Sequence, residues 1–439
     1  MLAKITQKLV GNERRGFRIF SLFAVSFIAL GLIGCEDPLK VENPNSLLEQ
    51  DLDNPIAAEG IVNGALGTVA QGVGFVLAPY STVTDEVTWI GSRNAWNDLN
   101  RGIVTDIQNE FVDNAMKYMH EGRWMADKAV IQMEKFDSEG VLEDRSLLGK
   151  AYLIAGMVRI YIADWFDDWA FSDKTEPAPA VGKDNMSKVY DDAIELLTKA
   201  VNVAREVGDT ELEARALACR ARAKHAKAVW QLLNPPGQAP DNPYVNAGAD
   251  DAAAALGLVD GSWKWQLMFG VGREWNDTAW QINGRKELAF VSDVADDPID
   301  GGDDPRIVAA ITDFTNIDKW GGTNYSPITV VSAREMHLII AEAKLASGDE
   351  AAAKNHLNAV RTMDGLTPLD NQITVGEMLV HERRANLFIQ GRRLNDMYRF
   401  GIKDPEWDVN SPAYTVPGSF LPITISERRA NPLIPISDE

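Results

Sequence analysis

Apolar residues recur at a helical spacing through much of the chain, and this pattern predicts a mostly α-helical fold. The segments that show it most clearly are Tyr118–Phe136, Gly149–Trp165, Lys188–Val207 and Glu211–Leu233. In each of them the apolar positions fall about 3.6 residues apart, the period of one helix face. Short turn-forming pieces separate several of these segments, so successive helices are expected to pack on one another.

A second helical region follows residue 330. Two four-residue stretches have the form of a capping box, SARE beginning at Ser332 and TVGE beginning at Thr374. Gly348 is placed to end the helix that Ser332 begins, and Asp349 is placed to begin an alanine-rich helix after it. A helix, a Gly-Asp turn and an alanine-rich helix together look like a tetratricopeptide hairpin.

No regular repeat of about 34 residues runs through the chain, so we expect a degenerate tetratricopeptide-like array. Its helices should lie near 118–233 and 333–400. The segments 75–115, 234–330 and 403–439 are rich in Gly, Pro, Asn, Asp and Trp and show little helical period. We expect these segments to form an irregular lobe of loops and small hairpins, including a short strand near ELAFVS (287–292). Loops on a rigid scaffold often carry binding residues.

The first residues have the composition of an export signal. Basic residues precede the apolar run Phe20–Ile33, which is short for a membrane span and fits the core of a signal peptide. Gly34 directly before Cys35 resembles the bacterial lipobox, in which the cysteine is acylated. A plain secretory signal is the alternative. We expect a lipoprotein signal peptide at 1–34, a lipidated tether at 35–55 and one domain at 56–439.

Charge narrows the function classes. The formal net charge is −21 and the pI is near 4.7, which argues against nucleic-acid binding, because phosphate recognition needs a basic face. Against this background the segment 381–401 concentrates five arginines. An anion site is one explanation, but internal carboxylate partners are the expected one, because apolar neighbours place these arginines on a half-buried surface. Cys219, in an alanine-rich helix, is expected to be a buried thiol.

Known catalytic patterns are missing from the sequence. It has no G-x-S-x-G, P-loop, H-E-x-x-H or dinucleotide fingerprint, and its five histidines do not fall at metal-ligand spacing. Five aspartates in DDPIDGGDD (296–304) are of the type that binds calcium, but their spacing does not match an EF-hand loop. A solvated loop is therefore expected there, and no cofactor is predicted. Paired acids for glycoside hydrolysis stay open, because such pairs meet only in the fold.

Tryptophans interleaved with amide and charged residues are the best binding candidates. Indole faces stack on the C–H faces of sugars, and amide, guanidinium and carboxylate groups pair with hydroxyls. Packing of the same tryptophans on the helical frame is the alternative. The candidate ligand-binding residues are Trp89, Arg93, Asn94, Trp96, Asp98, Trp275, Trp280, Trp320, Asn324 and Tyr325.

The arginine segment also carries a family resemblance. HERRANLFIQGRRLNDMYRFG (381–401) is similar to the C-terminal signature of the SusD/RagB family, a pattern of the form ERR-x-x-L-x-x-x-G-x-R-x-x-D. The segment 335–366 looks like the family's tetratricopeptide pair, and FLPITISERRANP (420–432) resembles its closing motif, with Thr424 where proline is commoner. DPR at 304–306 fits as well, and with the lipobox the resemblance covers nearly the whole chain.

The resemblance implies a helical tetratricopeptide-like body and an outer-membrane lipoprotein, facing outside the cell, that captures oligosaccharides or, in some members, peptides. It implies a TonB-dependent (SusC-like) transporter as partner, contact with the membrane only through the lipid anchor, and no catalysis. A tetratricopeptide adaptor that binds proteins and a surface glycosidase are the alternatives from other classes.

Overall fold

The computed structural model describes residues 53–436 except 174–175, 272–273 and 371. The expected signal peptide at 1–34, Cys35 and nearly all of the tether at 35–55 lie outside these described residues. The described residues from Asn54 onward form one compact unit.

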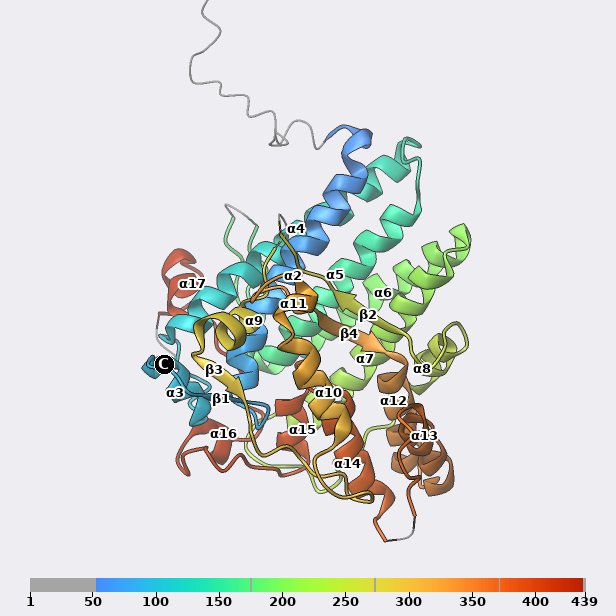
Figure 1. Ribbon diagram of the computed structural model, residues 1–439. Coiled ribbons are helices and arrows are strands. Elements are labelled where there is room, and N and C mark those ends of the chain that lie inside the picture. Colours follow the sequence, from blue (N-terminus) through green and yellow to red (C-terminus); the bar gives the residue numbers. More distant parts are fainter. Residues whose placement is uncertain (1–52, 174–175, 272–273, 371, 437–439) are drawn as a thin grey trace, which may run out of the picture. The chain divides into compact units, whose positions relative to one another are not determined.

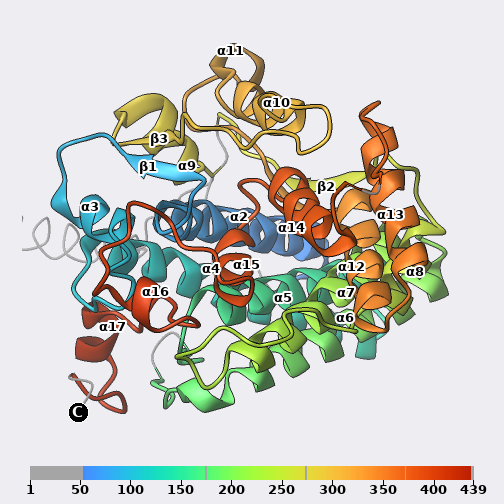
Figure 2. The ribbon, with the colours of Figure 1, turned by 90° about the horizontal axis from the view of Figure 1, so that it is seen from below.

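Long helices build the N-terminal part of this unit (Figure 1). They are α2 (Ala58–Thr82, preceded by the short η2, Pro55–Ala57), α4 (Glu110–Ser138), α5 (Ser146–Trp165), α6 (Ser187–Val207) and α7 (Thr210–Leu233). Successive helices lie side by side in Figure 2. Between α6 and α7, Gly208 takes a left-handed φ of 73° and the Asp209 side chain caps α7. The helical segments expected between residues 118 and 233 are confirmed.

Helix α2 corrects the expectation that residues from 75 onward form loops. It runs to Thr82, and α4 begins at Glu110, where the Asn109 side chain accepts hydrogen bonds from the first turn. The two helices approach closely at glycines. A Cβ on Gly72 would lie 2.9 Å from the Tyr118 carbonyl oxygen, and one on Gly122 would lie 2.9 Å from Val69 Cα. Gly72 and Gly122 are thus the positions at which the backbones of α2 and α4 come into contact.

Both α2 and α5 are long and apolar enough to cross a bilayer by composition alone. In the structure they are core helices, since α2 packs on α4 and α5 packs on α6. Cys219 of α7 is buried, as expected, and burial raises the pKa of its thiol to about 12.

The C-terminal helices are α12 (Ala333–Ala346), α13 (Glu350–Met363), α14 (Val375–Asn386) and α15 (Arg393–Arg399). The α12–α13 hairpin has the same Gly-Asp turn as the α6–α7 pair, with Gly348 at φ 81° and the Asp349 side chain capping α13. Thr374 and its glutamate form the full capping box at α14. At α12 only half of the expected box forms. Ser332 caps the helix, but the Glu335 carboxylate turns away to Arg222, at 2.7 Å from both Nε and Nη2.

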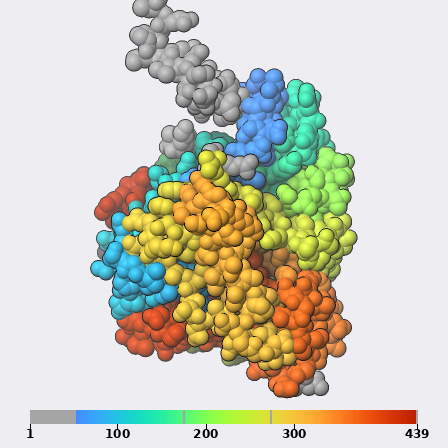
Figure 3. Space-filling model, in the orientation of Figure 1, coloured from blue at the N-terminus to red at the C-terminus, as the bar shows by residue number. Residues whose placement is uncertain are grey.

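The remaining elements are short. They are β1 (Val87–Trp89), α3 (Asn94–Asn100), η3 (Lys183–Asn185), α8 (Ala249–Leu256), β2 (Lys264–Leu267), α9 (Asp277–Ala279), the π-helical turn η4 (Trp280–Arg285), β3 (Leu288–Phe290), α10 (Pro305–Phe314), α11 (Ile317–Trp320), β4 (Ile328–Ser332), α16 (Pro412–Thr415) and α17 (Ile425–Ala430). Strand β1 pairs antiparallel with β3, and β2 with β4. We call residues 83–109 and 257–332 the loop-rich lobe. Its later part, yellow to orange, covers the middle of the face in Figure 3.

The arginines of segment 381–401 have internal carboxylate partners, as expected. Arg383 Nε lies 2.8 Å from Asp396, and both Arg393 and Arg384 bind Asp85, at 2.6 and 3.1 Å. The other two arginines of the segment pair with carboxylates outside it, Arg392 with Asp164 and Arg399 with Glu342. Most of these groups are fully buried, so the ion pairs fix how α15 sits against the rest of the body.

Candidate functional site

Two tryptophan side chains lie face to face in the loop-rich lobe. The ring centroids of Trp275 and Trp280 are 6.1 Å apart, and the ring planes differ by only 20°. Trp275 is 36% exposed and Trp280 is partly buried. We call these two residues the tryptophan pair. Parallel indoles at a surface give a flat apolar platform of the kind on which a sugar ring stacks.

Hydrogen bonds hold the segment of the tryptophan pair against the helical body. Asn276, which is fully buried, caps α9 and donates from its side chain to the Ser326 carbonyl at 2.8 Å. Thr278 donates to the carbonyl of Gly74 in α2, also at 2.8 Å. Gly284 lies under Trp280, where a Cβ would come 2.1 Å from the ring. The absence of a side chain at residue 284 therefore allows the Trp280 ring to lie against the backbone.

Two further rings back the tryptophan pair from the helical body. Phe75 of α2 lies 6.1 Å from Trp275 and stacks on Tyr118 of α4 at 3.9 Å. Neither ring was a candidate from sequence, because Phe75 lies in a helix that the sequence did not predict. The Lys117 ammonium lies 5.3 Å from the Tyr118 ring centroid.

The segment 319–325 joins this surface, so the structure brings two of the three candidate patches together. The Asn324 carbonyl accepts a hydrogen bond from the Asn276 backbone at 2.9 Å. Trp320 is half-buried, donates from Nε1 to the Asp313 carbonyl at 2.7 Å, and has the Lys319 ammonium 4.3 Å from its ring centroid. Tyr325 and the Asn324 side chain are also half-buried.

The first patch, residues 89–101, needs one correction. Trp96 is completely buried, and its ring stacks on Phe111 of α4 with centroids 3.9 Å apart. The expectation that Trp96 contacts a ligand is therefore wrong; it anchors α3 to the body. Trp89 is half-buried on β1, where it pairs with Leu288 of β3.

The polar candidates of the same patch stay at the surface. Arg93 and Asn94 are exposed, and Asp98 is half-buried. Arg93 Nη1 lies 3.3 Å from the Glu110 carboxylate, an exposed pair. The backbone before Arg93 is fixed by Glu287, whose carboxylate accepts from the Ser92 N–H at 2.9 Å. The patch is thus tied through Glu287 to the segment that follows the tryptophan pair.

The acidic residue Asp277 lies between Trp275 and Trp280 in the sequence. Burial raises the pKa of the Asp277 carboxyl to about 6, and the hydrogen bonds from Gln281 only partly offset this. The two Asp277 oxygens are 3.3 and 3.1 Å from Gln281 Nε2. Asp277 thus faces an amide, whereas glycoside hydrolysis by the common mechanism needs a second carboxyl group opposite it.

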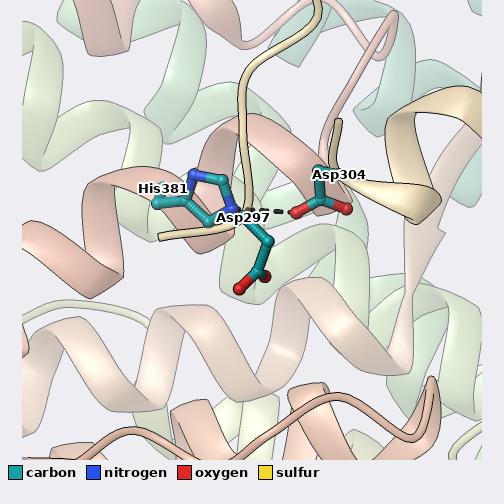
Figure 4. Close-up of side chains that lie close together, drawn as sticks. All are labelled: Asp297, Asp304 and His381. Carbon is teal, nitrogen blue, oxygen red and sulfur yellow. Dashed lines mark hydrogen bonds and ion pairs between the residues drawn. The ribbon is translucent and has the colours of Figure 1, made fainter. Parts of the chain in front are cut away.

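The aspartate-rich loop corrects another expectation. Asp297 and Asp304 are buried, so the loop is not simply solvated, and with His381 they form a cluster that could hold a metal ion (Figure 4). These carboxylates already form ion pairs with arginines. Arg361 lies 2.9 Å from Asp297, and Arg306 lies 2.7 Å from Asp304.

The pKa values of both aspartates are lowered, as expected for carboxylates in ion pairs. Burial raises the pKa of Asp297, but hydrogen bonds from Arg361 outweigh it and bring that pKa down to about 2. The pKa of Asp304 is likewise lowered, by hydrogen bonds from His381 and Arg306 that outweigh its burial. A cation at this cluster would have to displace two guanidinium groups, so the donor set does not fit calcium.

Comparison with known proteins finds a family model and solved structures that this chain resembles. Residues 299–430 match the model of the SusD family. A SusD superfamily protein from Bacteroides fragilis superposes with a TM-score of 0.61 at 16% identity, covering 87% of this chain and 98% of that one. A SusD-like carbohydrate binding protein from Bacteroides vulgatus gives 0.53 at 15% identity over 87% and 97%.

A SusD superfamily protein from Parabacteroides distasonis gives a TM-score of 0.57 at 14% identity, covering 89% of this chain and 99% of that one. No curated protein matches the chain by sequence. At these identities the solved structures establish the fold, which this chain shares over nearly the full length of each neighbour.

Proposed function

We propose that this chain, whose residues 299–430 match the SusD family model, is a cell-surface lipoprotein of that family that captures oligosaccharides and delivers them to a TonB-dependent outer-membrane transporter. Cys35 would carry the lipid anchor. A structural neighbour is described as a carbohydrate binding protein, which supports the ligand class. The observation that carries the proposal is the tryptophan pair, with its nearly parallel and partly exposed rings.

The geometry suits capture followed by release. The tryptophan pair offers stacking, which is tolerant of sugar identity, while Asn324 and Tyr325 nearby offer polar groups for hydroxyls. The pair is fixed in advance by Asn276, so little ordering is needed when a ligand binds. Affinity should be modest, because a nutrient must pass on to the transporter.

The other function classes have less support. A tetratricopeptide adaptor would bury its tryptophan loops on the helices, and Trp96 does so, but Trp275 does not. A glycosidase requires opposed carboxyl groups, and Asp277 faces Gln281 instead. Binding without bond breaking is the function that this geometry favours.

The test is binding of purified residues 54–439 to a mixed glycan and peptide array. The matched variants are the double substitution Trp275→Ala with Trp280→Ala, and the control Trp124→Ala, a half-buried tryptophan of α4. We expect glycan binding that the double variant loses and the control keeps. Glycan binding retained by the double variant would move the site away from the tryptophan pair, and binding of peptides alone would refute the oligosaccharide proposal.

A further inference from the structure

A separate cavity of about 380 Å³ lies between the loop-rich lobe and the C-terminal helices. Its walls come from the β2–β4 ribbon, α10, the start of α12 and the end of α14, which lie on one side of the molecule in Figure 2. Small-molecule sites in proteins have volumes of roughly 300–1,000 Å³. The cavity is therefore large enough for a short piece of a glycan.

Strand alternation makes one wall of this cavity polar. On β2, Trp265 and Leu267 point into the core, so Lys264 and Gln266 point the other way and line the cavity. On the partner strand, Thr329 also lines it and accepts a hydrogen bond from Gln266 at 3.1 Å. A ribbon with one apolar and one polar face thus supplies hydroxyl, amide and ammonium groups to the same wall.

Helix α10 and the segment before β2 also line the cavity. Ala309 and Ala310 of α10 line it with methyl groups only. Trp263 stands at the edge, half-exposed, with its Nε1 3.0 Å from a Glu211 oxygen. The cavity lining thus combines an indole, small apolar side chains and polar groups, the residue types that bind a sugar ring.

The charges of the cavity single out Lys264. Arg334 is held by Asp364, and Lys319 by Asp313. Arg306 is occupied by Asp304 and by a glutamate of α14. Among the described residues Lys264 has no carboxylate partner, and it is exposed on the cavity side of its strand. A protein with a net charge of −21 thus keeps one unpaired cation in a polar cavity.

We propose that this cavity is a subsite for the carboxylate of an acidic sugar, with Lys264 as its cationic contact and Gln266 and Thr329 as partners of the neighbouring hydroxyls. The inference rests on the proposed oligosaccharide capture and narrows its ligand class to uronate-containing glycans. Lys319 lines this cavity and also lies over the ring of Trp320, another of the candidate ligand-binding residues.

The test compares a short oligogalacturonate with its methyl ester, which has the same rings without the charge, by calorimetric titration of residues 54–439. We expect the acid to bind about tenfold tighter, the size of one charge-assisted hydrogen bond. Lys264→Gln should abolish this preference and leave the affinity for the ester unchanged, and Lys264→Arg should restore it. Lys188→Gln removes the same charge from an exposed position on α6 and should change nothing.

Equal affinity for acid and ester, or a preference that survives Lys264→Gln, would overturn the subsite. If neither probe binds while neutral glycans bind through the tryptophan pair, the subsite is wrong and the proposed function stands. If no glycan binds at all, both fall. Binding of acidic peptides but no glycan, dependent on Lys264, would overturn the assignment to sugars.

Discussion

Replacement of Glu86 by glutamine should make the protein more stable at neutral pH and leave it unchanged in mild acid. Glu86 follows α2 and is 2% exposed. Its Oε1 accepts a hydrogen bond from the Ile389 N–H at 2.9 Å, and its Oε2 has no hydrogen-bond partner. Burial raises the pKa of this carboxyl from 4.5 to about 8, while the Ile389 hydrogen bond opposes the rise.

The direction in which stability changes with pH follows from how many protons the folded and unfolded states bind. Between pH 4.5 and about 8 the folded protein keeps a proton on Glu86 that the unfolded chain has lost, so stability falls as the pH rises through this window. From pH 4.5 to 7 the loss is about 3 kcal/mol. This is slightly less than about 1.4 kcal/mol for each of roughly 2.5 pH units, because at pH 4.5 half of the unfolded chains still carry the proton. Glutamine keeps the acceptor for Ile389 and does not titrate. The Glu86→Gln protein should therefore gain up to about 3 kcal/mol at pH 7 and nothing near pH 4.5.

Urea unfolding of the wild type and the Glu86→Gln protein, at about pH 4.5, 6, 7 and 8, measures the difference in their free energy of unfolding across this window. Glu59→Gln, at an exposed position of α2, is the matched control and should leave the pH profile of the wild type unchanged. The reasoning would be refuted by a Glu86→Gln effect that is the same at every pH, because a constant difference reflects packing and not a shifted pKa.

Three further predictions concern single side chains. Gly284→Ala should push the Trp280 ring off the backbone and weaken glycan binding by about tenfold with little loss of stability, measured by titration calorimetry and thermal unfolding. Gly122→Val should overpack the contact between α4 and α2 and destabilise by about 1–3 kcal/mol in urea unfolding. Arg361→Met leaves the buried Glu382 with one fewer cation and should destabilise by about 3–5 kcal/mol in the same assay.

Each of these has a matched control. The controls are Gly270→Ala, five positions before Trp275 in the sequence, and Gly60→Ala on α2. At both positions a Cβ meets nothing within 4 Å. Both should leave binding intact and not destabilise. Arg145→Met removes an exposed ion pair and should change stability by less than about 1 kcal/mol. A control as damaging as its partner would show that the named contact is not the cause.

Local sequence signals predicted the fold where they acted within one element. The helical period, the Gly-Asp turn at 348 and the Thr374 capping box all have local causes and all are present. Helix α2 was not predicted, and one of its glycines, Gly72, has a tertiary cause that sequence alone does not show, the close approach of α4. Glu335 was misassigned for a similar reason, because a buried arginine from α7 competes for its carboxylate.

The candidate site also has residues that the sequence could nominate and residues that only the fold identifies. Residue type was enough to nominate Trp275, Trp280 and Trp320, because indole has the same affinity for sugar faces wherever it is exposed. Residue type could not separate Trp96 from them, since the same indole also fills a core, and only contact with Phe111 decides the matter. The Lys264 cavity was not foreseen, because its walls come from five stretches of the chain that are separate in the sequence.

The arginine segment shows why a family signature need not mark the ligand site. Its arginines reach carboxylates far along the chain, Asp85 from Arg393 across 308 positions and Asp164 from Arg392 across 228. Glu342, bound by Arg399, belongs to α12. The segment therefore joins the end of α2, the end of α5 and the tetratricopeptide-like hairpin into one rigid frame. Loops built on that frame can then carry ligand sites, as the tryptophan pair and the Lys264 cavity are proposed to do here.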